Sequence, residues 1–68
     1  MQIKFVTKEQ QVVVENRLAR GYEFMGYFQN LVGIKGPDIC VVKGRHRMHI
    51  NALGYDSYIP GTNYTEVK

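Results

Sequence analysis

The sequence predicts an α+β fold in which one helix packs on a three- to four-stranded antiparallel sheet, in the order β-α-β-β-β. The observations behind this are a stretch with helix-capping signals at both ends, several short runs rich in β-branched and aromatic residues, and glycine-containing turns between those runs. The 68 residues have room for a single small domain, 1–68, with a thin core. The composition, 44% apolar and 22% charged, is typical of a folded chain.

The helix is expected over residues 8–20. Thr7 and Gln10 form a capping box at its start, and Gly21 can end it in the left-handed conformation. The valines at 12–14 point in different directions around the helix axis, so more than one helix face is apolar. Core packing is the commoner cause of such a pattern, and a homodimer is the alternative.

Strands are expected before and after this helix. Residues 2–6 alternate apolar and polar side chains, which predicts a short strand, and the aromatic-rich stretch 22–28 predicts another. The sequence KGPD at 35–38 is typical of a turn, after which a strand restarts at residues 39–42.

Residues 39–42 and 45–50 are predicted to form a β-hairpin. Lys43 and Gly44 between them are compatible with a two-residue type I′ turn, which fixes the residues that face each other. The face expected to join the core contains Ile39, Val41, His46, Met48 and Ile50. The opposite face contains Cys40, Val42, Arg45, Arg47 and His49.

The formal net charge of +3 is concentrated in one segment. The basic residues of segment 35–49 are Lys35, Lys43, Arg45 and Arg47, against a single aspartate. Such an excess raises the local concentration of anions. Arginines on alternate strand positions lie about 7 Å apart and can bind phosphates through paired hydrogen bonds. The segment therefore predicts binding to nucleic acid or to a nucleic-acid-like acidic surface.

A sheet that binds single-stranded nucleic acid also needs exposed aromatic rings on which bases can stack. The candidates, if their strand adjoins the basic hairpin, are Tyr22, Phe24, Tyr27 and Phe28. In so small a domain these rings more often form the core.

The histidines and the cysteine do not predict catalysis or metal binding. His46 and His49 have the spacing of paired ligands, but an offset of three on a strand sends the two rings to opposite faces. We expect His46 to be semi-buried beside Met48, and His49 to lie on the surface. Cys40 opposite Arg47 could become a thiolate, but the chain lacks an oxyanion turn and the volume for a substrate pocket. We expect neither enzymatic activity nor a cofactor.

The C-terminal segment 51–68 is rich in tyrosine and in turn residues, which predicts irregular structure with a final short strand at 63–67. Tyr55, Tyr58 and Tyr64 suit either a lid over the sheet or anchors for a protein partner. The second reading gives an alternative function, a small inhibitor or regulator of the kind that phages or mobile elements encode. Its target would be a host protein or a nucleoprotein complex.

The two functions together predict a binding surface made of basic and tyrosine residues. Its members are Lys35, Lys43, Arg45, Arg47, His49, Tyr55, Tyr58 and Tyr64. The apolar runs are too short for a membrane span or a secretory signal, and a lone cysteine permits no internal disulfide. We therefore expect a cytoplasmic protein that does not enter membranes.

Overall fold

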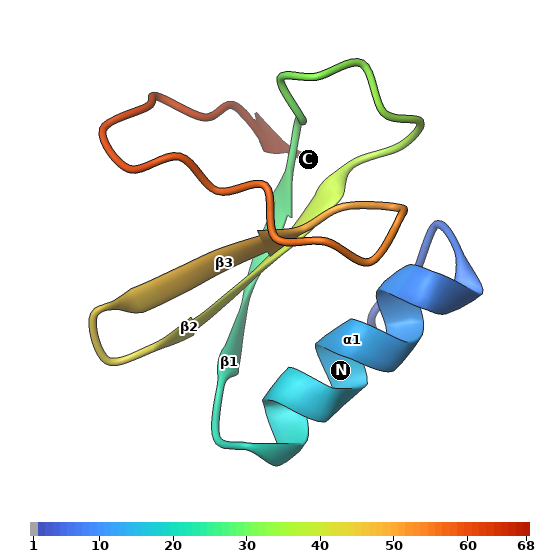
Figure 1. Cartoon of the computed structure of the whole chain (residues 1–68), viewed down its shortest axis with the longest axis vertical. Helices are drawn as coiled ribbons and strands as arrows, with labels where there is room; N and C mark the ends of the chain where they lie inside the picture. The colour runs from blue at the N-terminus through green and yellow to red at the C-terminus, as the bar shows by residue number, and fades with distance from the viewer. Residues whose placement is uncertain (1) are drawn as a thin grey trace.

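The computed structural model describes residues 2–68, so Met1 of the predicted domain lies outside the described residues. One helix is followed by four antiparallel strands in a single sheet with the order β3-β2-β1-β4, which confirms the α+β class (Figure 1). The elements are α1 Lys8–Ala19, β1 Glu23–Phe28, β2 Asp38–Lys43, β3 His46–Ile50 and β4 Glu66–Val67. The helix lies against one face of the sheet (Figure 1). The chain directly after β3 runs beside α1, and Tyr58 and Tyr64 then pack on the opposite face of the sheet.

The predicted helix cap at Thr7 is present, but the side chain of Gln10 bonds to the backbone of Val6, Pro37 and Ile50. Thr7 Oγ1 accepts a hydrogen bond from the Gln10 amide at 3.2 Å. Gln10 is fully buried, and its Oε1 accepts from the Val6 amide at 2.8 Å. Its Nε2 donates to the carbonyls of Pro37 and Ile50 at 3.1 and 2.9 Å. Gln10 thus joins the first turn of α1 to the start of β2 and the end of β3.

The predicted strand at residues 2–6 is wrong. These residues have no regular secondary structure. The edge of β1 that faces away from β2 pairs instead with β4, at Tyr27 and Phe28. Ile3 and Phe5 pack against the core instead. The alternation in the sequence therefore reflects an irregular segment with one side against the core, because one-sided burial produces the same period of two.

The β2–β3 hairpin is confirmed, but its turn lies one residue later than predicted. Lys43 pairs with His46, so Gly44 and Arg45 form the turn. Gly44 has φ of 60°, and positive φ within residues 2–68 occurs at glycines alone. Arg45 therefore cannot take the second left-handed position that a type I′ turn needs, whereas glycine in the first position suits type II′. Each strand partner moves by two residues, which preserves the predicted faces.

The core lies between α1 and the helix-facing side of the sheet. Its buried apolar residues are Val14, Ile39, Val41, Met48 and Ile50. The prediction for His46 is wrong, because this residue lies at the open end of the hairpin and is exposed. Its Nδ1 shares a hydrogen bond with the hydroxyl of Tyr22.

Candidate functional site

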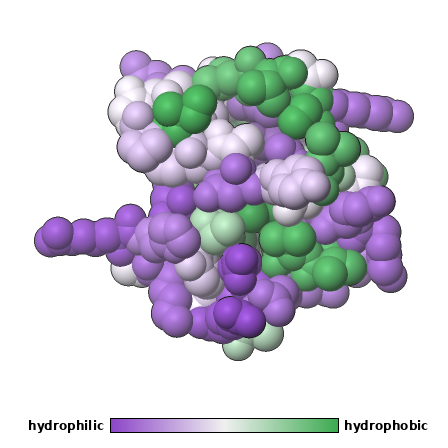
Figure 2. All heavy atoms as spheres, in the orientation of Figure 1, coloured by the Kyte–Doolittle hydropathy of each residue, from purple (hydrophilic) through white to green (hydrophobic). Residues whose placement is uncertain are grey.

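The Lys43 side chain, at the end of β2, reaches the C-cap of α1, so exposed basic residues of the hairpin and of the helix terminus lie at this end of the molecule. Lys43 Nζ donates to the Arg20 carbonyl at 2.8 Å and lies 6.0 Å from the centroid of the Tyr22 ring. A cation at this position satisfies a carbonyl that the helix leaves free and complements the helix dipole. We define the basic end as the exposed residues Arg20, Lys43, Arg45 and His46. Hydrophilic side chains project from the hairpin tip, at the left of Figure 2.

Lys35 is not part of the basic end. It lies before the first residue of β2, whereas Lys43 is the last residue of that strand. Six strand residues span roughly 20 Å, so Lys35 is separated from the hairpin tip by about the length of the strand. The structure thus divides the predicted basic surface into a cluster at the hairpin tip and an isolated exposed lysine.

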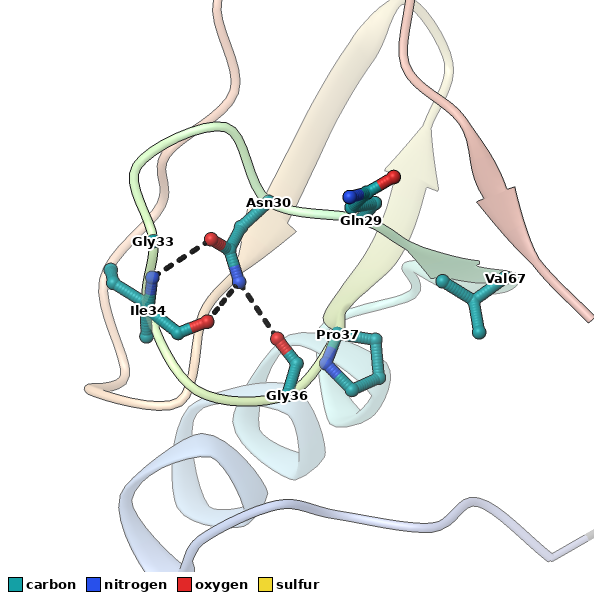
Figure 3. Close-up of a pocket in the computed structure, with 7 residues that line it drawn as sticks. All are labelled: Gln29, Asn30, Gly33, Ile34, Gly36, Pro37 and Val67. Carbon is teal, nitrogen blue, oxygen red and sulfur yellow. Dashed lines mark hydrogen bonds between the residues drawn. The ribbon is translucent and has the colours of Figure 1, made fainter.

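The loop that carries Lys35 is organised by Asn30. Its Oδ1 accepts from the Ile34 amide at 2.9 Å, and its Nδ2 donates to the carbonyls of Ile34 and Gly36 at 2.5 and 2.7 Å (Figure 3). A hollow of about 360 Å³ lies beside this loop. It is lined by Gln29, Asn30, Gly33, Ile34, Gly36, Pro37 and Val67. None of these side chains is ionisable, so the hollow offers no acid, base or nucleophile.

The sheet face opposite α1 is covered near its centre by part of the C-terminal segment. His49 is fully buried there, so the prediction of a surface histidine is wrong. The rings of Tyr58 and Tyr64 lie 5.1 and 4.3 Å from the His49 ring, and the ring of Phe28 lies 5.0 Å from it. Tyr58 and Tyr64 therefore act as a lid, which was one of the two readings of these residues.

Arg47 lies half-buried at the edge of this lid. Its Cζ is 5.0 Å from the centroid of Phe28 and 5.2 Å from that of Tyr58. Its Nε donates to His49 Nε2 at 3.0 Å, which requires a neutral His49 with its proton on Nδ1. Burial and then the charge of Arg47 lower the pKa of His49 to about 4. Arg47 is therefore held in place by two rings and one histidine.

The other polar groups on this face do not form a nucleophile and base. Asp38 is fully buried, and its Oδ2 accepts from the Ser57 hydroxyl at 3.0 Å. Burial raises the pKa of the Asp38 carboxyl, and burial also raises the pKa of the Cys40 thiol despite the nearby charge of Arg47. A rise in pKa disfavours the thiolate considered from the sequence. Within residues 2–68, no three His, Cys, Asp or Glu side chains gather as metal ligands.

Tyr55 differs from the other two tyrosines of the segment, because it is 70% exposed. It lies beside Val12 and Leu53, which are 55% and 59% exposed, along a hollow of about 400 Å³ between α1 and the loop after β3. Figure 2 shows hydrophobic side chains beside α1 in this region. We name Val12, Val13, Leu53 and Tyr55 the apolar groove.

The aromatic residues of β1 and Tyr22 just before it are divided between the two faces of the sheet. Tyr22, Phe24 and Tyr27 pack against the core on the helix side. Phe28 lies on the other face, against His49 and Arg47. Of the four candidates for base stacking, Phe28 alone shares a face with Arg47.

A scan against protein-family models and searches of curated proteins and of solved structures found no match. The function must therefore be argued from the chemistry of these residues. Within residues 2–68, no helix is long and apolar enough to cross a membrane.

The sequence did not indicate two of the basic-end residues for binding, namely His46, which was expected to be semi-buried, and Arg20. A cation near the end of a helix is explained by the helix dipole alone. The contact that joins Arg20 to Lys43 spans 23 residues, and the sequence contains no local signal for such a contact.

Proposed function

We propose that this protein is a non-enzymatic nucleic-acid-binding protein that contacts backbone phosphates through the basic end. The observation that supports this most is the hydrogen bond from Lys43 to the backbone carbonyl of Arg20, which brings the C-cap of α1 beside the end of β2, next to the turn that carries Arg45. These exposed cations outnumber the carboxylate of Glu23 at the start of β1. Clustered arginine and lysine side chains are the usual phosphate contacts of such proteins.

Arg47 extends this positive charge from the hairpin tip onto the sheet. It follows Arg45 by two residues and lies half-buried on the face opposite α1. A nucleic-acid strand could therefore pass from the tip along this face. The same chemistry would also suit an acidic protein surface that resembles nucleic acid, so the ligand series must include nucleic acids of several kinds.

The proposal is tested by fluorescence-anisotropy titration with single-stranded and duplex DNA and RNA at two salt concentrations. We expect salt-sensitive binding that the double variant Arg20→Gln/Arg45→Gln abolishes or strongly weakens. The matched control is Lys8→Gln/Lys35→Gln, which removes the same charge from two exposed positions outside the basic end. Absence of binding at low salt, or an equal loss in both double variants, would contradict the proposal.

The apolar groove supports a second candidate function, a small inhibitor or regulator that binds a host protein or nucleoprotein complex. Exposed apolar side chains gathered around a tyrosine are typical of the anchors of protein interfaces. Tyr55→Ala should weaken partner capture from cell extract by about 1 kcal/mol or more if the tyrosine is an anchor. Sedimentation velocity separates this case from a homodimer. If the groove joins two copies of the chain, the wild-type protein sediments as a dimer and the Tyr55→Ala variant as a monomer.

A further inference from the structure

We infer that a small slot on the sheet face opposite α1 takes one unpaired base of a single-stranded nucleic acid. This inference rests on the proposed function and names its substrate class. The slot has a volume of about 110 Å³. It is lined by Met25, Phe28, Cys40, Val42 and Arg47.

The slot is assembled by the three adjacent strands β1, β2 and β3. Met25 lies at the irregularity of β1 between Phe24 and Gly26, where the pairing with β2 changes register, and it is 53% exposed. Val42 from β2 pairs with Arg47 from β3, so these two side chains lie side by side on the same face. The lid formed by Tyr58 and Tyr64 covers His49 further along the face and leaves Met25 exposed.

The chemistry of the lining suits the flat face and polar edge of a nucleobase. Met25 and Val42 offer apolar contact, and Phe28 offers an aromatic ring. Arg47 supplies hydrogen-bond donors for the acceptors on a base edge. A slot of about 110 Å³ is far smaller than the pockets of larger ligands, which are roughly 300–1,000 Å³. One ring system fits, and the sugar and phosphates stay outside.

Arg47 is positioned before any ligand arrives. Its Nε is bonded to His49 Nε2 at 3.0 Å, and its guanidinium carbon lies within about 5 Å of the centroids of both Phe28 and Tyr58. Less side-chain entropy is therefore lost when its terminal amino groups bind a base. The sequence pattern gave Arg47 the role of a phosphate contact, whereas its half-buried place in the slot suits a base contact.

The slot is continuous with the basic end. Arg45 in the turn and Arg47 in β3 are two residues apart, so their Cα atoms are separated by at most about 7 Å. A phosphate bound at Arg45 would therefore place a neighbouring base at the slot. The bases of a duplex are stacked and paired, so they cannot enter, and the slot predicts a preference for single strands.

The test compares a short oligothymidylate with an abasic oligomer of the same length and charge, by fluorescence anisotropy. Phosphate contacts are common to both ligands, so the difference in affinity reports the base. We expect the oligothymidylate to bind at least about fivefold more tightly, the lower end of what one stacked base contributes. Equal affinities would overturn the base slot and leave the proposed function in place. Absence of binding to either ligand would overturn the base slot, and absence of binding to duplex DNA and RNA as well would overturn the proposed function.

The location of the base contact is tested with Met25→Glu. A carboxylate at the mouth of the slot would compete for the guanidinium of Arg47 and should abolish the preference for oligothymidylate over the abasic oligomer. The control is Leu31→Glu, which adds the same charge at an equally exposed residue of the loop between β1 and β2. The preference of this control variant for oligothymidylate over the abasic oligomer should remain unchanged. A preference that persists in Met25→Glu would overturn the assignment to this slot.

A direct measurement uses the methyl resonances of the methionines in the unaltered protein. Titration with oligothymidylate should shift the resonance of Met25, while Met48 in the buried core should remain unaffected. The abasic oligomer should shift the Met25 resonance much less. Equal shifts with both ligands would overturn the inference.

Discussion

His49 is a buried histidine whose pKa lies well below its ordinary value. The sequence placed this residue on the surface, but the rings of Phe28, Tyr58 and Tyr64 bury it. Because charging a buried imidazole is unfavourable, the pKa of His49 falls to about 4 from an unfolded value of about 6.5. Its neutral form is also the one that accepts the hydrogen bond from Arg47.

The depressed pKa of His49 predicts loss of stability in mild acid. Between about pH 6.5 and 4 the unfolded chain binds a proton that folded His49 does not, so the free energy of unfolding falls as the pH falls. The loss is on the order of 3 kcal/mol across that interval. Chemical denaturation across this pH range measures it, and His49→Phe should remove most of the decline. A wild-type stability that is constant over the interval would contradict the prediction.

Asp38 acts on stability in the opposite direction to His49 as the pH falls. Burial raises the pKa of its carboxyl, so folded Asp38 binds a proton at a higher pH than unfolded Asp38, and this group favours folding as the pH falls through its folded pKa. Asp38→Asn should therefore make the decline steeper, with His49 unchanged. If the free energy of unfolding of Asp38→Asn fell less steeply with pH than that of the wild-type protein, the effect assigned to Asp38 would be contradicted.

Gln10 provides a second prediction for a single residue. Gln10→Ala leaves the carbonyls of Pro37 and Ile50 and the amide of Val6 without their side-chain partner. We expect a loss of about 2–3 kcal/mol in the free energy of unfolding, because unsatisfied buried polar groups are costly. Gln11→Ala, in which the neighbouring glutamine loses only an exposed contact, should cost much less. Equal losses in the two variants would exclude the role assigned to Gln10.

The elements that the sequence predicted correctly are those with local signals. Thr7 and Gln10 mark the start of α1, and the runs at 39–42 and 45–50 are separated by a single turn. The strand at 2–6 was not predictable as irregular, because its alternation depends on packing against a core that is distant in the sequence. The position of the hairpin turn was equally ambiguous, since one glycine can serve two turn types.

The turn assignment predicts the effect of replacing Gly44. No heavy atom outside its chain neighbours lies within 4 Å of a Cβ built on Gly44, so Gly44→Ala costs only the strain of a positive φ. This strain is worth about 1–2 kcal/mol, and Gly44→Asn should cost less because asparagine tolerates the left-handed region. Thermal unfolding measures both variants. A Gly44→Ala variant with the same thermal stability as the wild-type protein would contradict a positive φ at this residue.

For the whole molecule, the candidate site depends on contacts between distant segments that no local pattern contains. The sequence correctly placed Arg47 and His49 on one face and identified the hairpin as basic. It gave no indication that Arg20 meets Lys43, and it left a lid that includes Tyr64 as one of two alternatives without predicting that His49 lies beneath it. These contacts turn the predicted stripe of basic residues into an exposed basic end, a half-buried Arg47 and a buried histidine.

The salt dependence of affinity for a single-stranded oligonucleotide tests phosphate binding by the basic end most directly. If Arg20, Lys43 and Arg45 each neutralise one phosphate, a plot of log affinity against log salt concentration has a slope of about −2. Arg20→Gln/Arg45→Gln should bring this slope to about −0.7, while Lys8→Gln/Lys35→Gln should leave it unchanged. A wild-type slope near zero, or the same change of slope in both double variants, would contradict nucleic-acid binding through the basic end.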